Sequence, residues 1–488
     1  MKSTVPLTRI RPLNGESART DGDFVLYWMV ANRRPRWNFA LQHAVARALE
    51  YDKPLVVLEA LGCRHRWAND RSHRFLLDGM ADNAEAFRGT PVLYYPYVEP
   101  EPQAARGLIE ALGAHACTVI TDDWPCSFVP RAQAAAARLL RVSLDAVDAS
   151  CVVPMRVPER AFPRAHGFRR FLHGCLREHL AVFPEKNPLA RRRLMPAGRL
   201  PTAIRERWPA ADVRSLRDPR LIAELPIDHG VAAAEESGGW RAGSARLSRF
   251  IKQSLDQYVD NGRHPDCDGT SGLSPHLHFG HVSAHEAVDA VMAWENRFPE
   301  DLPETGNGRR SGWWGMGDAA EAFLDQLITW RELGFNMCAQ REDYEQYDSL
   351  PDWSRRTLEE HGHDARDHVY DLEVFDHGET HDEIWNAAQR QLRESGRMHN
   401  YLRMLWGKKI LEWTASPQEA LAVMIELNNR YALDGRDPNS TSGIFWILGR
   451  YDRAWGPERP VYGKIRYMSS DNTRRKLKLR SYLARWGR

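Results

Sequence analysis

The sequence predicts an N-terminal α/β domain with a doubly wound parallel sheet, a long connector and a C-terminal all-helical domain. Three observations predict this order of domains. Continuous apolar runs alternate with helical periodicity over the first quarter of the chain, whereas the last half is helical almost throughout. The stretch between them is rich in Pro and Arg and shows no such alternation. We therefore expect an α/β domain over 20–130, a connector over 131–245 and a helical domain over 246–488.

The first domain is predicted to alternate buried strands with helices. Its apolar runs lack the polar alternation of a half-buried strand, which is typical of strands covered on both faces. The order βαβα implies a parallel, Rossmann-like sheet, although neither a G-x-G-x-x-G nor a P-loop pattern accompanies it. The strands are expected at 24–30, 54–61, 91–98 and 117–123, and the helices at 38–50 and near 72–87 and 101–113.

The second half is predicted to be helical because its apolar residues recur three and four positions apart. The connector before it is expected to hold some helix among Pro-rich and Arg-rich stretches. The predicted helical segments are 246–258, 284–296, 318–337, 381–413 and 417–431.

Composition excludes several classes of protein. The longest apolar run, Phe24 to Ala31, is far too short to span a bilayer, and the N-terminus has no apolar core of a secretory signal. Seven Cys at irregular spacing, without a C-x-x-C pair, argue against a zinc site or a disulfide framework. We therefore expect a cytoplasmic protein without a metal, nucleoid-associated if the source is prokaryotic. The large excess of Arg over Lys fits either codon usage or phosphate binding.

Tryptophan and basic residues both gather in the C-terminal half. The chain has 17 Trp, more than either Phe or Tyr, and residues 461–488 are strongly basic. Cations that neutralise phosphates, together with aromatic faces that stack on bases, are typical of a nucleic-acid site. The other interpretation is a solvated basic tail and core tryptophans.

Hydroxyl groups cluster just before a helix predicted to start near Ser283. Such a cluster suits a bound phosphate, although Ser and Thr before a helix are usually only caps. The segment TSGLSPHLHFG resembles the flavin-phosphate loop of the photolyase and cryptochrome family, and YVDNGRHP resembles a turn of that family that meets the same phosphates. The resemblance implies FAD, held here by Tyr258, Arg263, Thr270, Ser271, Gly272, Leu273 and Ser274.

The run IWNAAQRQLRESGRMHNYLRMLWGKKILEWT and the segments ELNNRYALDGRDPNSTSGIFWILGRYDRAWG and GKIRYMSSDNTRRK closely resemble class II cyclobutane pyrimidine dimer (CPD) photolyases. The likeness is dense over about 250–480 and looser over 20–125. It implies a DNA-repair enzyme, a carbon–carbon lyase in which light-excited reduced FAD passes an electron to a flipped dimer. The implied partner is UV-damaged DNA, and we expect a monomer.

Three tryptophans are spaced so that they can form a path for electrons. Trp406 and Trp413 lie seven residues apart on one predicted helix, on the same face and about 10.5 Å apart along its axis. Trp385 lies on the preceding helix. Alone, such residues usually fill a core. The resemblance implies that Trp406 lies nearest the flavin, Trp385 follows, and Trp413 is the solvent-side end.

The resemblance also assigns residues beside the flavin and the lesion. It implies an Arg403–Asp434 salt bridge and Asn428 at the reactive flavin nitrogen, where a fixed cation would stabilise negative charge. A plain surface salt bridge is the other interpretation of that pair. Asp437 is a further implied flavin contact. At the lesion the implied residues are Trp330, Trp446, Met404 and Asn400, with Arg453, Trp455 and Arg466 filling the hole and holding phosphates.

One departure from the family pattern bears on function. Class II enzymes typically carry a Glu in the segment FLDQLITWRELGF, where this chain has Gln326. Gln hydrogen-bonds pyrimidine carbonyls but neither shares a proton nor carries a negative charge. Gln326 therefore leaves open a photolyase with altered lesion preference, such as for the (6-4) photoproduct. The alternative from another class of protein is a cryptochrome-like photoreceptor. The resemblance further implies an antenna chromophore, a deazaflavin of the 8-HDF type, in the α/β domain.

Overall fold

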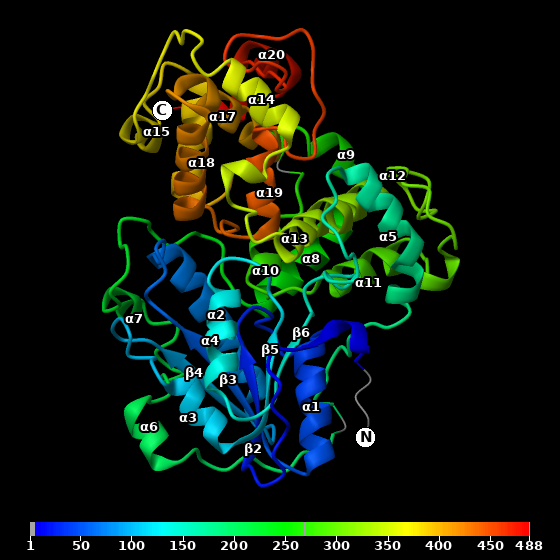
Figure 1. The fold of residues 1–488 in the computed structure, drawn as a ribbon, viewed down its shortest axis with the longest axis vertical. Coiled ribbons are helices and arrows are strands. Elements are labelled where there is room, and N and C mark those ends of the chain that lie inside the picture. The colour runs from blue at the N-terminus through cyan, green and yellow to red at the C-terminus, as the bar shows by residue number, and fades with distance from the viewer. Residues whose placement is uncertain (1–4, 191, 268, 488) are drawn as a thin grey trace. The chain divides into compact units, whose positions relative to one another are not determined.

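A computed structural model describes residues 5–190, 192–267 and 269–487 of the chain. These residues form two compact units whose segments interleave along the sequence (Figure 1). Of the described residues, the first unit takes those within 1–157, 175–249 and 272–300. The second takes those within 158–174, 250–271 and 301–488.

The first unit is built on a six-stranded sheet with the order β1-β6-β5-β2-β3-β4. Strands β2 to β6 run parallel, and the short edge strand β1 pairs antiparallel with β6. Strand β2 lies between β5 and β3, so the sheet winds in both directions from it, as predicted. The strands are β1 Ile10–Pro12, β2 Phe24–Met29, β3 Leu55–Leu61, β4 Leu93–Val98, β5 Ala116–Asp122 and β6 Leu144–Val147.

Both faces of this sheet are buried. Val25 and Tyr27 belong to one core cluster, whereas their neighbours Phe24 and Leu26 belong to another. Because successive side chains of a strand point to opposite faces, this division explains the continuous apolar runs in the sequence. The helices that accompany the strands are α1 Phe39–Tyr51, α2 Asp70–Phe87, α3 Leu108–His115 and α4 Val129–Leu139, and the unit also holds α6 Thr202–Arg207, α7 Pro219–Ala223, α10 Ser274–His278 and α11 Ala284–Trp294.

The structure differs from the prediction where segments are short. Helix α3 begins only at Leu108, because residues 101–107 form turns that end at Gly107 with φ 89°. Strands β1 and β6 were not predicted, since three or four residues carry too little periodicity. Strand β6 and helices α6 and α7 lie in the range predicted as a connector. The domain boundaries at 20–130, 131–245 and 246–488 remain a prediction.

The second unit is helical, and every strand assigned in the described part of the chain lies before residue 148. Helices α5 Ala165–Leu180 and α8 Trp240–Gln253 each contribute residues to both units. The other helices are α9 Tyr258–Asn261, α12 Asp318–Leu324, α13 Arg331–Gln340, α14 Asp352–Glu360, α15 Leu372–His377, α16 Glu383–Ser395, α17 Asn400–Trp413, α18 Pro417–Tyr431, α19 Pro438–Ile447, α20 Ser470–Lys476 and α21 Arg480–Trp486.

Two predicted helices are interrupted. The segment 381–413 divides into α16 and α17 at Gly396, whose left-handed φ of 71° ends α16. The segment 318–337 is divided by a π-helical turn, η5 Asp325–Trp330, between α12 and α13. No helix in the described part of the chain is both long and apolar enough to cross a membrane.

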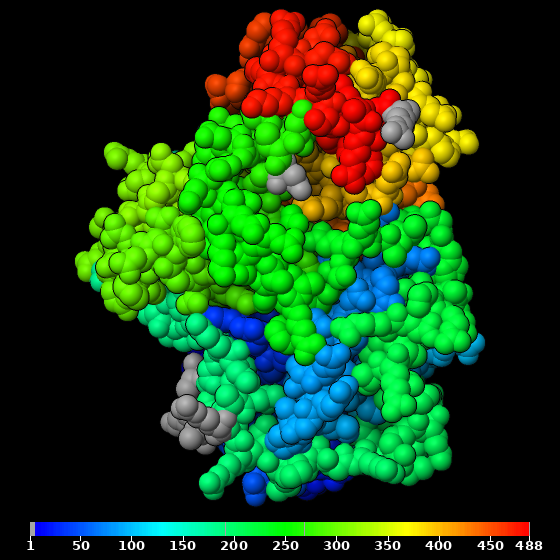
Figure 2. Space-filling model, turned by 180° about the vertical axis from the view of Figure 1, so that it is seen from behind, coloured from blue at the N-terminus to red at the C-terminus, as the bar shows by residue number. Residues whose placement is uncertain are grey.

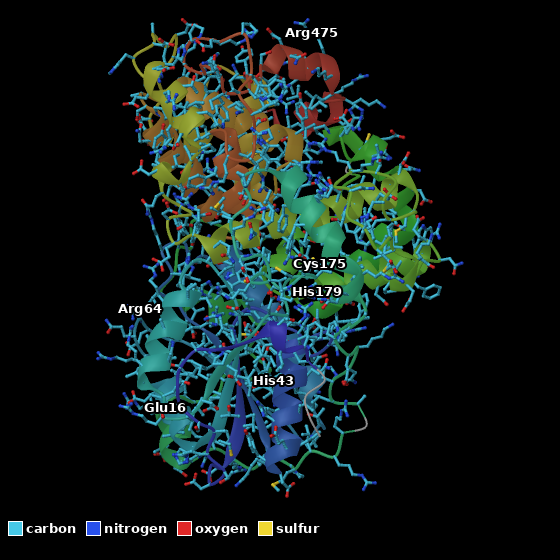
Figure 3. All side chains as sticks on the ribbon, turned by 45° about the vertical axis from the view of Figure 1, so that its right-hand side comes forward. Glu16, His43, Arg64, Cys175, His179 and Arg475 are labelled. Atoms are coloured by element: carbon cyan, nitrogen blue, oxygen red, sulfur yellow. The ribbon has the colours of Figure 1, made fainter. Side chains whose placement is uncertain are left out.

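The basic C-terminal segment is folded. Helix α21 packs on the short helix η3 Pro265–Cys267, and the Asp266 carboxylate accepts hydrogen bonds from the backbone N–H groups of Ser481 (3.2 Å) and Tyr482 (2.7 Å). Figure 2 shows this red segment against the green one. The cations of α20 remain exposed, among them Arg475 at the outer surface (Figure 3). The segment is therefore an ordered basic surface.

Candidate functional site

Trp385 and Trp406 form a buried stack between helices α16 and α17. Their ring centroids lie 6.4 Å apart with an interplanar angle of 5°, and their exposed fractions are 0% and 1%. The Trp385 Nε1 atom donates to the Trp406 carbonyl (2.9 Å), and the Trp406 Nε1 atom donates to the Gln389 Oε1 atom (2.9 Å). Since a buried indole N–H needs an acceptor, these two bonds fix both rings.

Trp413 extends the stack through Trp385. Its ring centroid lies 6.0 Å from that of Trp385 at an angle of 66°, so Trp385 contacts both of the other rings. The order Trp406, Trp385, Trp413 expected from the family therefore corresponds to direct ring contacts. Its exposed fraction is only 3%, because Tyr370 and His381 pack on it, and its role as the solvent-side end of the series stays a prediction.

Polar residues on α17, α18 and α19, and on the loop between the last two helices, make two further sets of contacts. Arg403 on α17 donates from Nη2 to the Asp434 carboxylate at 3.3 Å, with both side chains partly buried. The buried Asn428 amide donates to Asn429 Oδ1 (3.1 Å) and Ser440 Oγ (2.9 Å), which uses both of its hydrogens. Only its Oδ1 atom therefore remains to accept from a ligand. Asp437 caps α19 by accepting from the Asn439 N–H at 2.8 Å.

Trp330 and Trp446 stack on each other at 4.6 Å with an interplanar angle of 11°. Trp330 ends η5 and Trp446 lies on α19, and both side chains are half-buried. Helices α13 and α19 approach closely at Gly334, where an added Cβ would lie 2.5 Å from the Pro438 carbonyl oxygen. The missing side chain at Gly334 thus permits the close packing of the two helices that carry this aromatic pair.

The π-helical turn η5 also carries Gln326, whose side chain is exposed. Turns of this kind occur frequently at functional sites. Its first residue, Asp325, accepts two hydrogen bonds from Arg169 of α5, at 2.6 Å and 2.9 Å. The Arg169 side chain is 3% exposed, so this bidentate pair is largely shielded from water. The pair anchors the turn that presents Gln326 and Trp330.

Replacing Arg169 with Met is expected to lower the free energy of unfolding by about 3–5 kcal/mol, because the Asp325 carboxylate would stay buried without its partner. The measurement is a urea titration of the FAD-loaded protein. The matched variant combines Arg169→Met with Asp325→Leu, which removes both charges and should recover most of the loss. An equal loss in the single and double variants would contradict the role of the ion pair.

Arg453, Trp455 and Arg466 lie together on the loops after α19. The guanidinium carbons of Arg453 and Arg466 lie 4.4 Å and 5.2 Å from the Trp455 ring centroid, and both arginines are exposed. The backbone N–H of Trp455 donates to the Lys464 carbonyl at 2.9 Å, which joins the two loop segments. An aromatic ring flanked by two exposed cations can meet both a base and phosphates.

The predicted phosphate loop has a backbone that only glycine adopts easily. Gly272 has a φ of 65°, and an added Cβ would overlap the Arg246 guanidinium group. A guanidinium group beside the backbone of such a loop is a cationic donor that fits the phosphates of FAD. A short helix, α10, begins at Ser274 and was not predicted, whereas the helix expected near Ser283 starts at Ala284 with Ser283 as its N-cap.

The remaining predicted residues are placed as follows. Tyr258 is half-buried against Phe250 and Phe323, and desolvation, with a smaller effect of the Asp325 charge, raises the pKa of its phenol to about 12. Arg263 is exposed. On α17, Asn400 is exposed and Met404 is half-buried one turn later. Thr270 and Ser271 belong to the second unit, and Gly272, Leu273 and Ser274 to the first.

The prediction missed four side chains that position this site. Gln389 lies one turn after Trp385, a signal that helical spacing could have supplied. Arg169, Arg246 and Tyr370 come from distant or irregular segments, and no local pattern marks them.

No family model matches the chain. Among curated proteins it is similar to the deoxyribodipyrimidine photo-lyase of Methanothermobacter thermautotrophicus, 32% identical over 480 residues, with 98% of this chain and 97% of the relative covered. The deoxyribodipyrimidine photo-lyase of Oryza sativa subsp. japonica is 32% identical, with 98% of this chain and 90% of the relative covered. The deoxyribodipyrimidine photo-lyase of Potorous tridactylus is also 32% identical, with 92% of this chain and 79% of the relative covered.

The fold is similar to the crystal structure of a bacterial class III photolyase from Agrobacterium tumefaciens, with a TM-score of 0.62 and 16% identity over 89% of this chain and 80% of that one. The predicted class, a parallel α/β sheet combined with a helical domain, is thereby confirmed as a photolyase fold. The curated relatives show more than the fold, because they are 32% identical to this chain over nearly its whole length. The chain belongs to the deoxyribodipyrimidine photo-lyase family.

Proposed function

We propose that this protein is a class II photolyase that repairs cyclobutane pyrimidine dimers in UV-damaged DNA with light. The chain is a deoxyribodipyrimidine photo-lyase by family, with FAD as its cofactor. The stacked Trp406–Trp385–Trp413 series is the structural observation that best supports a flavin photochemistry, because contacting indoles offer single electrons a path. The class II assignment is supported by the motifs in 384–414 and 426–456.

Bound FAD in its reduced form supplies the light-driven electron that splits the dimer. Arg403, held by Asp434, would stabilise negative charge on the reduced flavin without a metal or a proton transfer. The Asn428 Oδ1 atom would accept a hydrogen bond from a flavin N–H, since both amide hydrogens are already used. Tyr258, Arg263, Asp437 and the loop 270–274 are the proposed ligands of the rest of the cofactor.

The lesion must leave the duplex before it can react, and photolyases are an established case of base flipping. A dimer that pairs poorly costs less to unstack, which contributes selectivity. The half-buried faces of Trp330 and Trp446 would pack against the extruded dinucleotide, with Met404, Asn400 and Gln326 at its edges. The Arg453–Trp455–Arg466 group would occupy the vacated position and hold phosphates.

The experiment that tests the proposal presents reduced protein with oligonucleotides that carry either a CPD or a (6-4) photoproduct, with and without blue light. We expect light-dependent restoration of the CPD substrate. Restoration of the (6-4) substrate alone would instead support an altered lesion preference. Restoration of neither would leave the cryptochrome-like photoreceptor as the better proposal.

Gln326 permits a direct test of lesion preference. We expect Gln326→Glu to raise the CPD repair rate several-fold, because a carboxyl group can share a proton with a pyrimidine carbonyl as charge develops there. The measurement is single-turnover repair under saturating light, with Gln326→Ala as the control that removes all hydrogen bonding. If Gln326→Glu repaired the CPD more slowly than the wild type, the amide of Gln326 would be the group better suited to this lesion.

Three further properties are proposals from the resemblance. We propose an antenna of the deazaflavin (8-HDF) type in the α/β unit, a monomeric state and a cytoplasmic location. None of the seven cysteines, all of which lie in the described part of the chain, is in a disulfide, which supports a reducing compartment. Absorption spectra of chromophores released by denaturation, and light scattering of the holoenzyme, test the first two.

A further inference from the structure

Trp413, the last ring of the tryptophan series, is covered by two side chains from the segments that flank α15. Tyr370 packs edge-on against it, with ring centroids 5.8 Å apart at 90°, and its backbone N–H donates to the Trp413 carbonyl at 3.0 Å. His381 lies 4.9 Å from the same ring. Because Trp413 is only 3% exposed, Tyr370 and His381 are side chains through which an electron from solution can reach the series.

Tyr370 and His381 are hydrogen-bonded to each other. The Tyr370 hydroxyl lies 2.7 Å from the His381 Nδ1 atom. The same hydroxyl oxygen accepts the backbone N–H of His381 at 3.3 Å, and the hydroxyl donates to Nδ1 when the neutral imidazole carries its hydrogen on Nε2. His381 is exposed and stacks on the exposed His368 at 3.9 Å. A phenol bonded to an imidazole that reaches solvent is an arrangement in which loss of an electron and loss of a proton are coupled.

Charges around the pair favour a neutral imidazole. Burial lowers the pKa of His381, and the charges of His368 and Lys409 lower it further, whereas Asp382 and Glu412 oppose them. The Lys409 ammonium lies 5.3 Å from the Trp413 ring centroid and is paired with Glu412 at 2.6 Å.

We propose that Tyr370 is the terminal electron donor of the tryptophan series and that His381 accepts its phenolic proton. The inference rests on the proposed role of Trp406, Trp385 and Trp413. After Trp413 has given one electron inward, it takes one electron from Tyr370 while the O–H proton of Tyr370 moves to His381 Nδ1. The products are neutral Trp413, a neutral tyrosyl radical and an imidazolium. A small-molecule thiol in solution then returns one electron and one proton to Tyr370, and His381 releases its proton to water.

The test uses FAD-loaded protein with oxidised flavin, illuminated in the presence of a thiol. Tyr370→Phe keeps the ring that packs on Trp413 but removes the redox-active hydroxyl. We expect the tyrosyl radical signal in electron paramagnetic resonance to disappear, a longer-lived tryptophan radical in transient absorption, and a several-fold lower yield of photoreduction. The matched control is Tyr467→Phe. Tyr467 belongs to the same unit and is 37% exposed.

The role of His381 has its own readout. In the wild type the photoreduction yield should fall on acidification, below the usual titration range of histidine, as the imidazole becomes protonated and stops accepting. His381→Gln should lower the yield at neutral pH and remove this pH step, which a merely structural role would not do. Unchanged radical signals in Tyr370→Phe, with photoreduction still blocked in Trp406→Phe, would overturn this inference alone. Unchanged photoreduction in Trp406→Phe would overturn the proposed tryptophan series instead.

Discussion

Replacing Trp406 with Phe is expected to abolish photoreduction of the flavin while sparing repair by chemically reduced enzyme. Trp406 is the inner end of the buried stack, in contact with Trp385 at 6.4 Å. Phe fills much of the same space, but its ring is far harder to oxidise than an indole. The measurement compares flavin bleaching under blue light with CPD repair after dithionite reduction.

Two controls make this result interpretable. Trp294→Phe changes a tryptophan that is 44% exposed and outside the proposed series, and should leave photoreduction unchanged. Because Trp406→Phe also leaves the Gln389 Oε1 atom without its donor, a stability loss of about 1–3 kcal/mol is expected, and flavin content must be measured. Unchanged photoreduction in a flavin-loaded Trp406→Phe protein would contradict the assignment.

Replacing Trp330 with Ala is expected to weaken binding of damaged DNA by roughly 5- to 150-fold, the equivalent of about 1–3 kcal/mol for one base–aromatic stack. The substitution removes one ring of the Trp330–Trp446 pair and no charge, so affinity for undamaged duplex should change little. Titrations of matched duplexes with and without a CPD measure both. We expect the variant to bind the duplex with a CPD little more tightly than the undamaged duplex.

Arg466→Ala provides the complementary variant. Arg466 is exposed and lies beside Trp455, so its loss should weaken damaged and undamaged DNA alike and reduce the salt slope of binding by about one. If Trp330→Ala behaved in the same way as Arg466→Ala, the aromatic pair would have no role in lesion recognition.

Long periodic segments were predictable, and short or composite ones were not. The runs that became β2, β3 and β5 are largely apolar on both faces because both faces of the sheet are covered. Strands β1 and β6 are too short to carry a pattern and exist only because each pairs with a neighbour. The turn η5 reads as continuous helix in sequence, since a π-helical turn changes hydrogen-bond spacing without changing composition.

The sequence by itself determined the fold class, the family resemblance and the fact that Trp406 and Trp413 share one helix face. Helical spacing depends only on positions along one segment, so it is readable without a structure. Only the tertiary structure decided that Trp385 contacts both rings, that Arg169 anchors η5, and that Tyr370 and His381 cover Trp413. These contacts join segments far apart in the chain, and local periodicity carries no information about which distant side chain will fill a given space.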